Sequence, residues 1–315
     1  MVICFPVGVN LIWDSGPYAI LMPGQLSERS GMALPLAGDE VFERLAGGFD
    51  ALTGGRFRYW VTQAPAEELG GRFVAPTAMV LYGALCAEVA LSRFGPPEAV
   101  AGYSLGFYAA GLFARCVKAS AVLEWLDRVN AANGRDFPPG RFALASETGL
   151  SRAEIEALFD RWGLAEVTVA NINNPKQVVF AGPRGAVQRA MERLKGLVME
   201  VRLLPLDVPL HTPYVERARS EATPWWQGVA ASDPLWPIIS PRDGRVIIAG
   251  REFRKEVAEA LSAPTDWVAA VTRLRELGLR RLLDLSPGGE LGRMARWTVR
   301  DLEILPVSSL WESGA

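Results

Sequence analysis

The chain has 315 residues, of which 50% are hydrophobic and 22% are charged, and this composition excludes a disordered protein. Its net charge of −2 excludes the strongly basic balance of a general nucleic-acid-binding protein. The three cysteines lie far apart, and the single histidine, His211, excludes a multi-histidine metal site. We therefore expect about two domains, a reducing cytoplasmic setting, and neither a metal nor another cofactor.

The N-terminal segment Met1 to Trp13 is apolar, but it lacks a basic start and a small-residue cleavage site. It is therefore not interpreted as a signal peptide. No uninterrupted run of 18 apolar residues follows it. We expect neither a membrane nor a nucleic acid among the partners.

Short apolar segments alternate with longer helical ones in the first part of the chain. The predicted elements are a strand at 19–22, a helix at 77–94, a strand at 98–103 and a helix at 105–114. The helix at 77–94 ends at Gly95-Pro96-Pro97, because proline cannot continue the hydrogen-bond ladder. This alternation predicts an α/β fold with a parallel sheet.

A boundary is predicted at Phe137-Pro138-Pro139-Gly140. The pattern beyond it is strand 142–146, helix 151–162, strands 166–171 and 177–181, helix 185–195 and strand 199–204. This βαββαβ order is that of a ferredoxin-like unit. We expect a small inserted domain at 140–206 and a large domain formed by 1–139 and 207–315, which ends with a helix at 265–277, a strand at 281–285 and a turn at 287–289.

The pentapeptide Gly102-Tyr103-Ser104-Leu105-Gly106 fits G-x-S-x-G, and it stands between a predicted strand and a predicted helix. That context is typical of a nucleophile elbow, in which two glycines permit a sharp turn and leave the serine hydroxyl exposed. The alternative is an ordinary strand–turn–helix junction with a serine cap.

A serine hydroxyl needs a base before it can attack a carbonyl group. His211 is the only histidine available, and it lies between two prolines where the chain returns to the large domain. Catalytic residues often lie on such loops. The alternative is a histidine without a catalytic role.

Six motifs occur in one order along the chain. They are Pro23-Gly24-Gln25, Gly102 to Ala110, Asn171 to Val179, Val208-Pro209-x-His211, Pro264-x-x-Trp267 and Ser286-Pro287-Gly288-Gly289. Together they resemble the malonyl-CoA:acyl carrier protein transacylase family, which includes free-standing acyltransferases of polyketide and fatty-acid synthesis. The resemblance implies an α/β-hydrolase-like large domain with a ferredoxin-like insertion, in agreement with the predicted elements.

The resemblance also implies roles for individual residues. Ser104 would become the acyl ester and His211 its base, with the backbone amides of Gln25 and Leu105 as the oxyanion hole. Arg128 would bind the free carboxylate of a malonyl group, since a guanidinium holds a carboxylate through two parallel hydrogen bonds. The remaining substrate contacts implied are those of Asn173, Leu210 and Tyr103.

Several positions depart from the family pattern. Tyr103 replaces the usual His, Phe107 a usual Glu, and Leu26 a usual Gly. Ala260 stands where relatives carry a Gln whose backbone carbonyl orients the histidine, a contact that alanine can also make. The segment between Ser104 and Arg128 is one residue shorter than in the family pattern. These departures concern the identity of the acyl group more than the type of reaction.

The function expected is transfer of a malonyl or related acyl group from CoA to the phosphopantetheine thiol of an acyl carrier protein. The alternatives are transfer of a non-malonyl acyl group between carrier proteins, an editing thioester hydrolase and a non-catalytic scaffold. The segment 271–300 has seven arginines against three acidic residues, a local charge of +4. Arg293, Arg296 and Arg300 are therefore candidates for carrier-protein docking, and the alternative is a solvated helix face.

Overall fold

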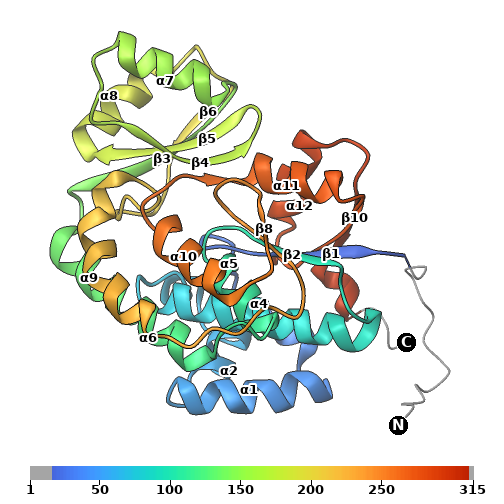
Figure 1. Cartoon of the computed structure of the whole chain (residues 1–315). Helices are drawn as coiled ribbons and strands as arrows, with labels where there is room; N and C mark the ends of the chain where they lie inside the picture. Colours follow the sequence, from blue (N-terminus) through green and yellow to red (C-terminus); the bar gives the residue numbers. More distant parts are fainter. Residues whose placement is uncertain (1–15, 312–315) are drawn as a thin grey trace.

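The computed structural model describes residues 16–311 and contains two β-sheets (Figure 1). The larger sheet has the strand order β11-β10-β1-β2-β7-β8. Its strands are β1 (Tyr18–Met22), β2 (Ala99–Gly102), β7 (Ile238–Ile239), β8 (Val246–Ile247), β10 (Arg281–Asp284) and β11 (Glu303–Pro306). All neighbouring strands are parallel except the pair β7 and β8. The predicted parallel α/β sheet is therefore present.

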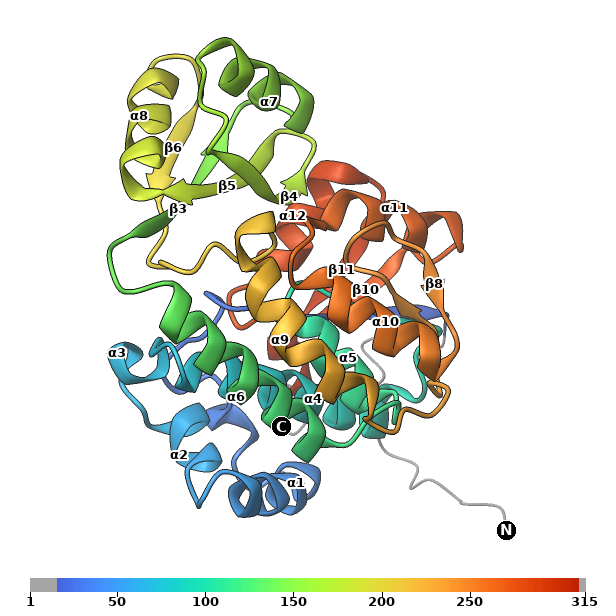
Figure 2. The ribbon, with the colours of Figure 1, turned by 60° about the vertical axis from the view of Figure 1, so that its left-hand side comes forward.

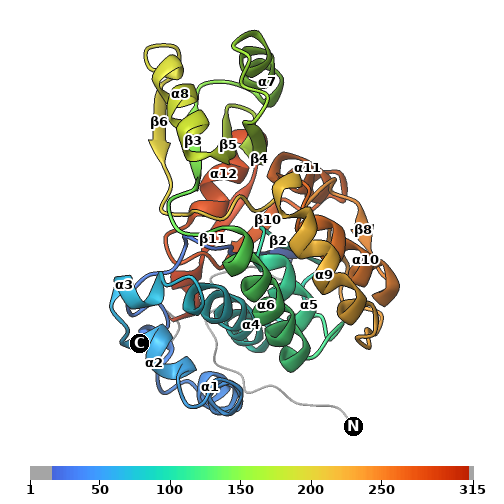
Figure 3. The ribbon, with the colours of Figure 1, turned by 90° about the vertical axis from the view of Figure 1, so that its left-hand side faces the viewer.

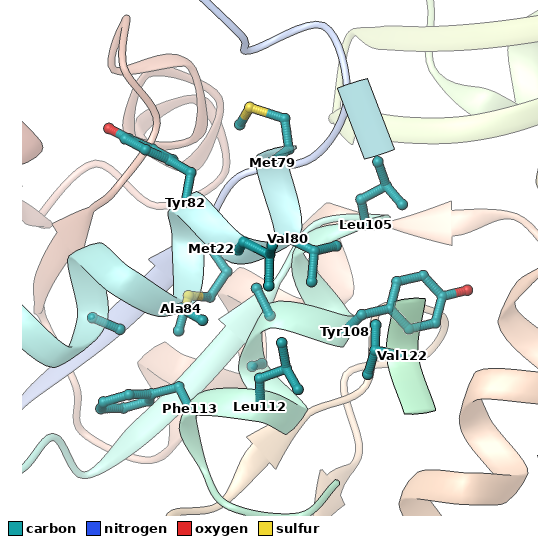
Figure 4. Packing of buried hydrophobic residues seen from close by; sticks show 14 of the residues in the cluster. Met22, Met79, Val80, Tyr82, Ala84, Leu105, Tyr108, Leu112, Phe113 and Val122 are labelled. Carbon is teal, nitrogen blue, oxygen red and sulfur yellow. The ribbon is translucent and has the colours of Figure 1, made fainter. Parts of the chain in front are cut away.

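Helices cover both faces of this sheet, and strand β1 shows how. Ile20 and Met22 point to the face packed by α4 (Val74–Phe94) and α5 (Gly106–Phe113), whereas Ala19 and Leu21 point to the face packed by α11 (Trp267–Glu276) and α12 (Glu290–Thr298). Successive side chains of a strand face opposite ways, so a strand buried on both faces is apolar throughout. Figure 4 shows the first of these cores, where Met79 and Val80 of α4 lie near Met22 and Leu105.

Helix α4 is the only helix in residues 16–311 that is long and apolar enough to cross a membrane, and 78% of its apolar window is buried inside the protein. It therefore serves as the central helix of the large core. The other helices of the large domain are η1 (Leu34–Leu36), α1 (Glu40–Leu52), α2 (Phe57–Thr62), α3 (Ala66–Leu69), α6 (Ala119–Asp136), η2 (Pro213–Val215), α9 (Glu216–Gln227), α10 (Gly250–Ala260) and η3 (Val307–Leu310).

The second sheet has the order β6-β3-β5-β4-β9. Its chain order is β3 (Phe142–Thr148), α7 (Arg152–Arg161), β4 (Thr168–Asn174), β5 (Gln177–Pro183), α8 (Arg184–Leu194) and β6 (Glu200–Leu203). This βαββαβ unit, here called the small domain, lies at one end of the molecule (Figure 2). The N-cap residue of helix α7 is Ser151, whose side chain forms a reciprocal capping box with Glu154. The predicted fold class, with its ferredoxin-like insertion, is confirmed.

Several predicted boundaries differ from the structure by two or three residues, and one of these differences matters for how the domains are joined. The helix expected at 265–277 begins only at Trp267, because Thr265 and Asp266 form strand β9 (Thr265–Asp266) beside Asn171 and Ile172 of β4. The Asp266 side chain then caps α11 by accepting a hydrogen bond from the Ala269 amide. Strand β9 thus joins the small-domain sheet to the segment that leads into α11, and Figure 3 shows α12 under that sheet.

Candidate active site

Ser104 lies between β2 and α5 on a tight turn. Its φ of 52° lies in the left-handed region, which residues other than glycine rarely adopt. The two flanking glycines are required by space: a Cβ on Gly102 would lie 2.3 Å from the Gly106 carbonyl, and one on Gly106 would lie 2.1 Å from the Met22 carbonyl oxygen. The turn therefore has the form of a nucleophile elbow, with the serine at the amino end of α5.

His211 reaches this serine from the loop that returns from the small domain. Its Nε2 lies 2.7 Å from Ser104 Oγ. The His211 backbone amide donates to the Leu261 carbonyl at 2.9 Å, and the residue has a φ of 63°. The structure thus brings together two residues 107 positions apart in the chain.

The second ring nitrogen of His211 fixes the tautomer. Nδ1 lies 2.8 Å from the Ala260 carbonyl oxygen. A carbonyl oxygen only accepts hydrogen bonds, so Nδ1 carries the proton and Nε2 is free to accept from the serine hydroxyl. Burial lowers the pKa of His211 below its usual 6.5, while the bond to Ala260 opposes that shift. The imidazole is therefore neutral and basic at neutral pH.

The two backbone amides expected to form an oxyanion hole are Gln25 and Leu105. Both residues line the cavity next to Ser104 and His211. Within residues 16–311 neither amide has a protein acceptor. Leu105 is also the N-cap residue of α5, where the helix dipole favours negative charge. A developing oxyanion at Ser104 can therefore be stabilised from two sides.

A cleft of about 540 Å³ opens at Ser104 and His211 between the two sheets. Its walls come from the small-domain strands on one side and from α12 on the other. The Tyr103 hydroxyl donates to Asn173 Oδ1 at 2.6 Å, and Asn173 Nδ2 donates to Gln177 Oε1 at 3.3 Å. Tyr103 and Asn173 thus line the cleft as a hydrogen-bonded pair that links the two domains.

A second cavity of about 140 Å³, here called the inner pocket, also reaches Ser104 and His211. Leu210 lines both cavities. Helix α6 contributes Leu126, Val129, Asn130 and Asn133, which share one helix face through i, i+3, i+4 and i+7 spacing. Arg72, from the turn before α4, also lines this pocket.

Arg128 does not take the position that the resemblance implies. Its guanidinium pairs with Glu124 at 2.7 Å and lies 4.8 Å from the centre of the Trp225 ring, with 44% of the side chain exposed. It lines neither of the two cavities. One residue turns a helical position by about 100°, so the missing residue before Arg128 rotates it outward and places Val129 on the inner face. The assignment of Arg128 as the carboxylate-binding residue is therefore corrected.

The three arginines proposed for docking lie on or after α12. Arg293 lines the cleft and bonds the Gly288 carbonyl oxygen, and its side chain is 64% exposed. Arg296 is exposed, and the Arg300 guanidinium lies over the Trp297 ring. Trp297 itself is 51% exposed and lines the same cleft. An apolar surface with adjacent positive charge therefore borders the cleft.

Sequence reasoning missed three polar residues of the inner pocket, namely Arg72, Asn130 and Asn133. The helical spacing of Asn130 and Asn133 after Leu126 is the signal that could have indicated their shared face. In the part of the chain that the structure describes, no group of His, Cys, Asp or Glu side chains is arranged to hold a metal ion.

Residues 21–310 match the family model described as the acyl transferase domain. The chain belongs to this family, and it is an acyltransferase. A malonyl CoA-acyl carrier protein transacylase of Haemophilus influenzae is 28% identical over 303 residues, covering 93% of this chain and 96% of that protein. A polyketide-biosynthesis malonyl CoA-acyl carrier protein transacylase of Bacillus subtilis is 24% identical and covers 91% and 98% of the two chains.

Solved structures share the fold. A malonyl CoA-acyl carrier protein transacylase of Coxiella burnetii superimposes with a TM-score of 0.87 at 24% identity, covering 94% of this chain and 95% of that one. A type II polyketide malonyl-transacylase in complex with its acyl-carrier protein gives 0.88 at 23% identity, covering 95% and 100%. The arrangement of sheets and helices described above is thus the fold of these proteins.

Proposed function

We propose that the protein transfers a malonyl or related acyl group from a CoA thioester to the phosphopantetheine thiol of an acyl carrier protein, through an ester on Ser104. The observation that carries this proposal is the contact between Ser104 Oγ and His211 Nε2, with Nδ1 held by the Ala260 carbonyl. No cofactor is required, because His211 serves both proton transfers. The buried free thiols of Cys86 and Cys116 agree with a reducing, cytoplasmic setting.

In the first half-reaction, Ser104 Oγ attacks the thioester carbonyl carbon as its proton moves to His211 Nε2. The carbonyl oxygen becomes an oxyanion that the Gln25 and Leu105 amides stabilise. The carbon–sulfur bond then breaks, and His211 returns the proton to the departing CoA sulfur. The product is an acyl ester on Ser104 and free CoA thiol.

The second half-reaction repeats these steps with a new nucleophile. The thiol of the carrier protein's phosphopantetheine gives its proton to His211 Nε2, and its sulfur attacks the ester carbonyl. When the ester bond breaks, the proton passes to Ser104 Oγ and the serine is regenerated. The long cleft between the domains supports this step, because it offers a path for an extended arm to reach Ser104.

The relatives support the donor and the acceptor. Both curated relatives named above are malonyl CoA-acyl carrier protein transacylases and align over nearly their whole length. The acyl group itself is not supported by Arg128, which faces away from the cavities. A carboxylate-binding arginine would be of little use to a general thioesterase, and Arg128 does not lie in the cavities to play that part. The experiment must therefore separate transfer from hydrolysis.

The test is intact-protein mass spectrometry after incubation with malonyl-CoA and other acyl-CoA donors. Transfer predicts a mass gain on Ser104 that persists in water and disappears when a phosphopantetheinylated carrier protein is added, with a matching gain on the carrier. Rapid loss of the ester in water alone would indicate a hydrolase. Failure of every donor to label Ser104 would contradict the proposal.

A further inference from the structure

The lining of the inner pocket includes two polar side chains with unpaired atoms, Arg72 and Asn133. The Nε atom of Arg72 and the Oδ1 atom of Asn133 are both buried, and within residues 16–311 neither atom has a hydrogen-bond partner. Asn133 is only 2% exposed. Buried polar groups in folded proteins almost always have partners, so these two atoms each need a polar partner, which a group bound in the pocket can supply.

Arg72 is held in place by the carboxyl end of α6. Its Nη1 donates to the Phe137 carbonyl at 3.2 Å and its Nη2 to the Asn133 carbonyl at 3.1 Å. These bonds fix the guanidinium while leaving Nε free. Arg72 takes part in no ion pair within residues 16–311, and it is the only Arg or Lys that lines the inner pocket. A fixed, unpaired cation of this kind favours an anionic ligand group.

The inner pocket also has apolar lining residues, among them Leu126 and Val129. Leu126 and Val129 present their side chains first along α6, and Asn133 follows Val129 by one helical turn, a rise of about 6 Å. The volume of about 140 Å³ is close to that of an engineered cavity, ~150 Å³, that holds benzene. A bound group therefore needs an apolar stretch followed by a polar end.

We propose that Arg72 and Asn133 determine specificity by binding the distal carboxylate of a dicarboxylic acyl group longer than malonyl, of the succinyl size class. This inference rests on the proposed acyl-Ser104 chemistry. Arg72 Nε donates to the carboxylate. Asn133 donates through Nδ2 when its amide is rotated by 180°, which puts the nitrogen where the unpaired Oδ1 lies, because an amide oxygen cannot bond a carboxylate. Leu126 and Val129 contact the methylene groups of the ligand. Asp207, the one acidic residue in the pocket lining, belongs to the return loop and not to α6.

The test compares acyl-CoA donors of equal chain length with and without the carboxylate. Succinyl-CoA is paired with butyryl-CoA, and malonyl-CoA with propionyl-CoA, and kcat/KM for Ser104 acylation is measured in single turnover. We expect the wild-type enzyme to prefer succinyl over butyryl by about tenfold or more, the effect of one hydrogen bond to a charged group. A larger preference within the malonyl pair would overturn the assignment of chain length.

The variants are Arg72→Met and Asn133→Leu, with Arg128→Met as the matched control on the outer face of α6. Each of the first two should reduce the preference for succinyl about tenfold and leave butyryl within about twofold, whereas Arg128→Met should change neither. Asn133→Leu keeps the backbone carbonyl that Arg72 bonds, so it separates recognition from the anchoring of α6.

Equal loss for both donors in Asn133→Leu, or an unchanged preference in both pocket variants, would show that the pocket does not bind a carboxylate. If Ser104 is acylated but succinyl is not preferred over butyryl, only the inference about Arg72 and Asn133 is contradicted. An enzyme that no donor acylates contradicts the proposed function instead.

Discussion

Backbone strain is concentrated at the reacting residues. Four residues other than glycine have a positive φ in the part of the chain that the structure describes, and three of them, Leu26, Ser104 and His211, line the cleft. Such conformations cost about 1–3 kcal/mol each and persist only where the surroundings impose them. Here the elbow glycines and the Leu261 carbonyl impose them, with the result that Oγ and Nε2 face each other.

The catalytic pair should behave as one unit. We expect Ser104→Ala to abolish the acyl-enzyme and His211→Ala to slow its formation by at least about a thousandfold. The double variant should be little worse than either single one, because each substitution already removes the function of the pair. Acylation rates measured by rapid-quench mass spectrometry test this. Independent, multiplying losses would show that His211 does not act through Ser104.

The pH dependence of acylation follows from the pKa of His211. Only neutral His211 accepts the serine proton, and burial lowers its pKa below 6.5. The acylation rate should therefore decrease as the pH falls through the lowered pKa, with a midpoint below pH 6.5. Single-turnover rates between about pH 5 and 8 test this. A midpoint at or above pH 6.5 would contradict the assigned shift.

The sequence was informative about the catalytic pair and less so about the pocket. Ser104 follows a recognisable turn and His211 is the only histidine, so neither needs three-dimensional information to be chosen. Arg128 and Val129 are neighbours in sequence, yet they face opposite environments. Which of them faces inward depends on the rotation of α6, and one residue fewer between Ser104 and Arg128 changes which side chain faces the pocket.

At the scale of elements, the turn between β2 and α5 sets the site. Gly106 is packed so closely on the end of β1 that no side chain fits. Gly106→Ala should therefore lower the free energy of unfolding by about 2–3 kcal/mol and abolish acylation, because the elbow must move. Chemical denaturation and the acylation assay measure both effects.

Gly134 provides the matched control. It lies within α6, and a Cβ there would have no atom within 4 Å. Gly134→Ala should raise the free energy of unfolding by about 0.5–1 kcal/mol through helix propensity. If Gly106→Ala and Gly134→Ala changed the free energy of unfolding equally and only slightly, the close contact between Gly106 and β1 would not be needed for stability.

Elements with a strong local pattern were predicted within a few residues, as α4, α5 and β5 illustrate. Strand β9 was not predicted, because a strand of two residues has no periodicity in the sequence. Its conformation depends on pairing with β4, about 95 positions earlier in the chain. Helix α7 shows the opposite case, since the Ser151 and Glu154 capping box marks its start locally.

At the scale of the whole molecule, charge borders the entrance to the cleft. We expect Arg296→Glu together with Arg300→Glu to slow transfer to an acidic carrier protein and to weaken its salt dependence, since rim charges act mainly on association. Acylation by the CoA donor should change much less. The two half-reactions, measured separately at several salt concentrations, make this comparison.

Exposed charges on α10 serve as the control for this docking surface. Arg251→Glu together with Lys255→Glu changes the net charge equally but away from the cleft lining. This variant should leave the carrier-protein step unchanged. If the α12 variant also leaves that step unchanged at low salt, the docking surface lies elsewhere.

Strand β9 has a consequence for how this fold can be recombined. The small domain is one continuous segment of the chain, connected to the large domain once at each end. This arrangement suggests that it can be exchanged as a unit between relatives. Its β4, however, pairs with two residues that belong to the recipient, and unpaired strand edges promote association. In a chimera, the β4 strand of the donor therefore has to pair in register with the β9 strand of the recipient. Joining the two proteins correctly only at the two ends of the small domain leaves this strand pairing unmatched.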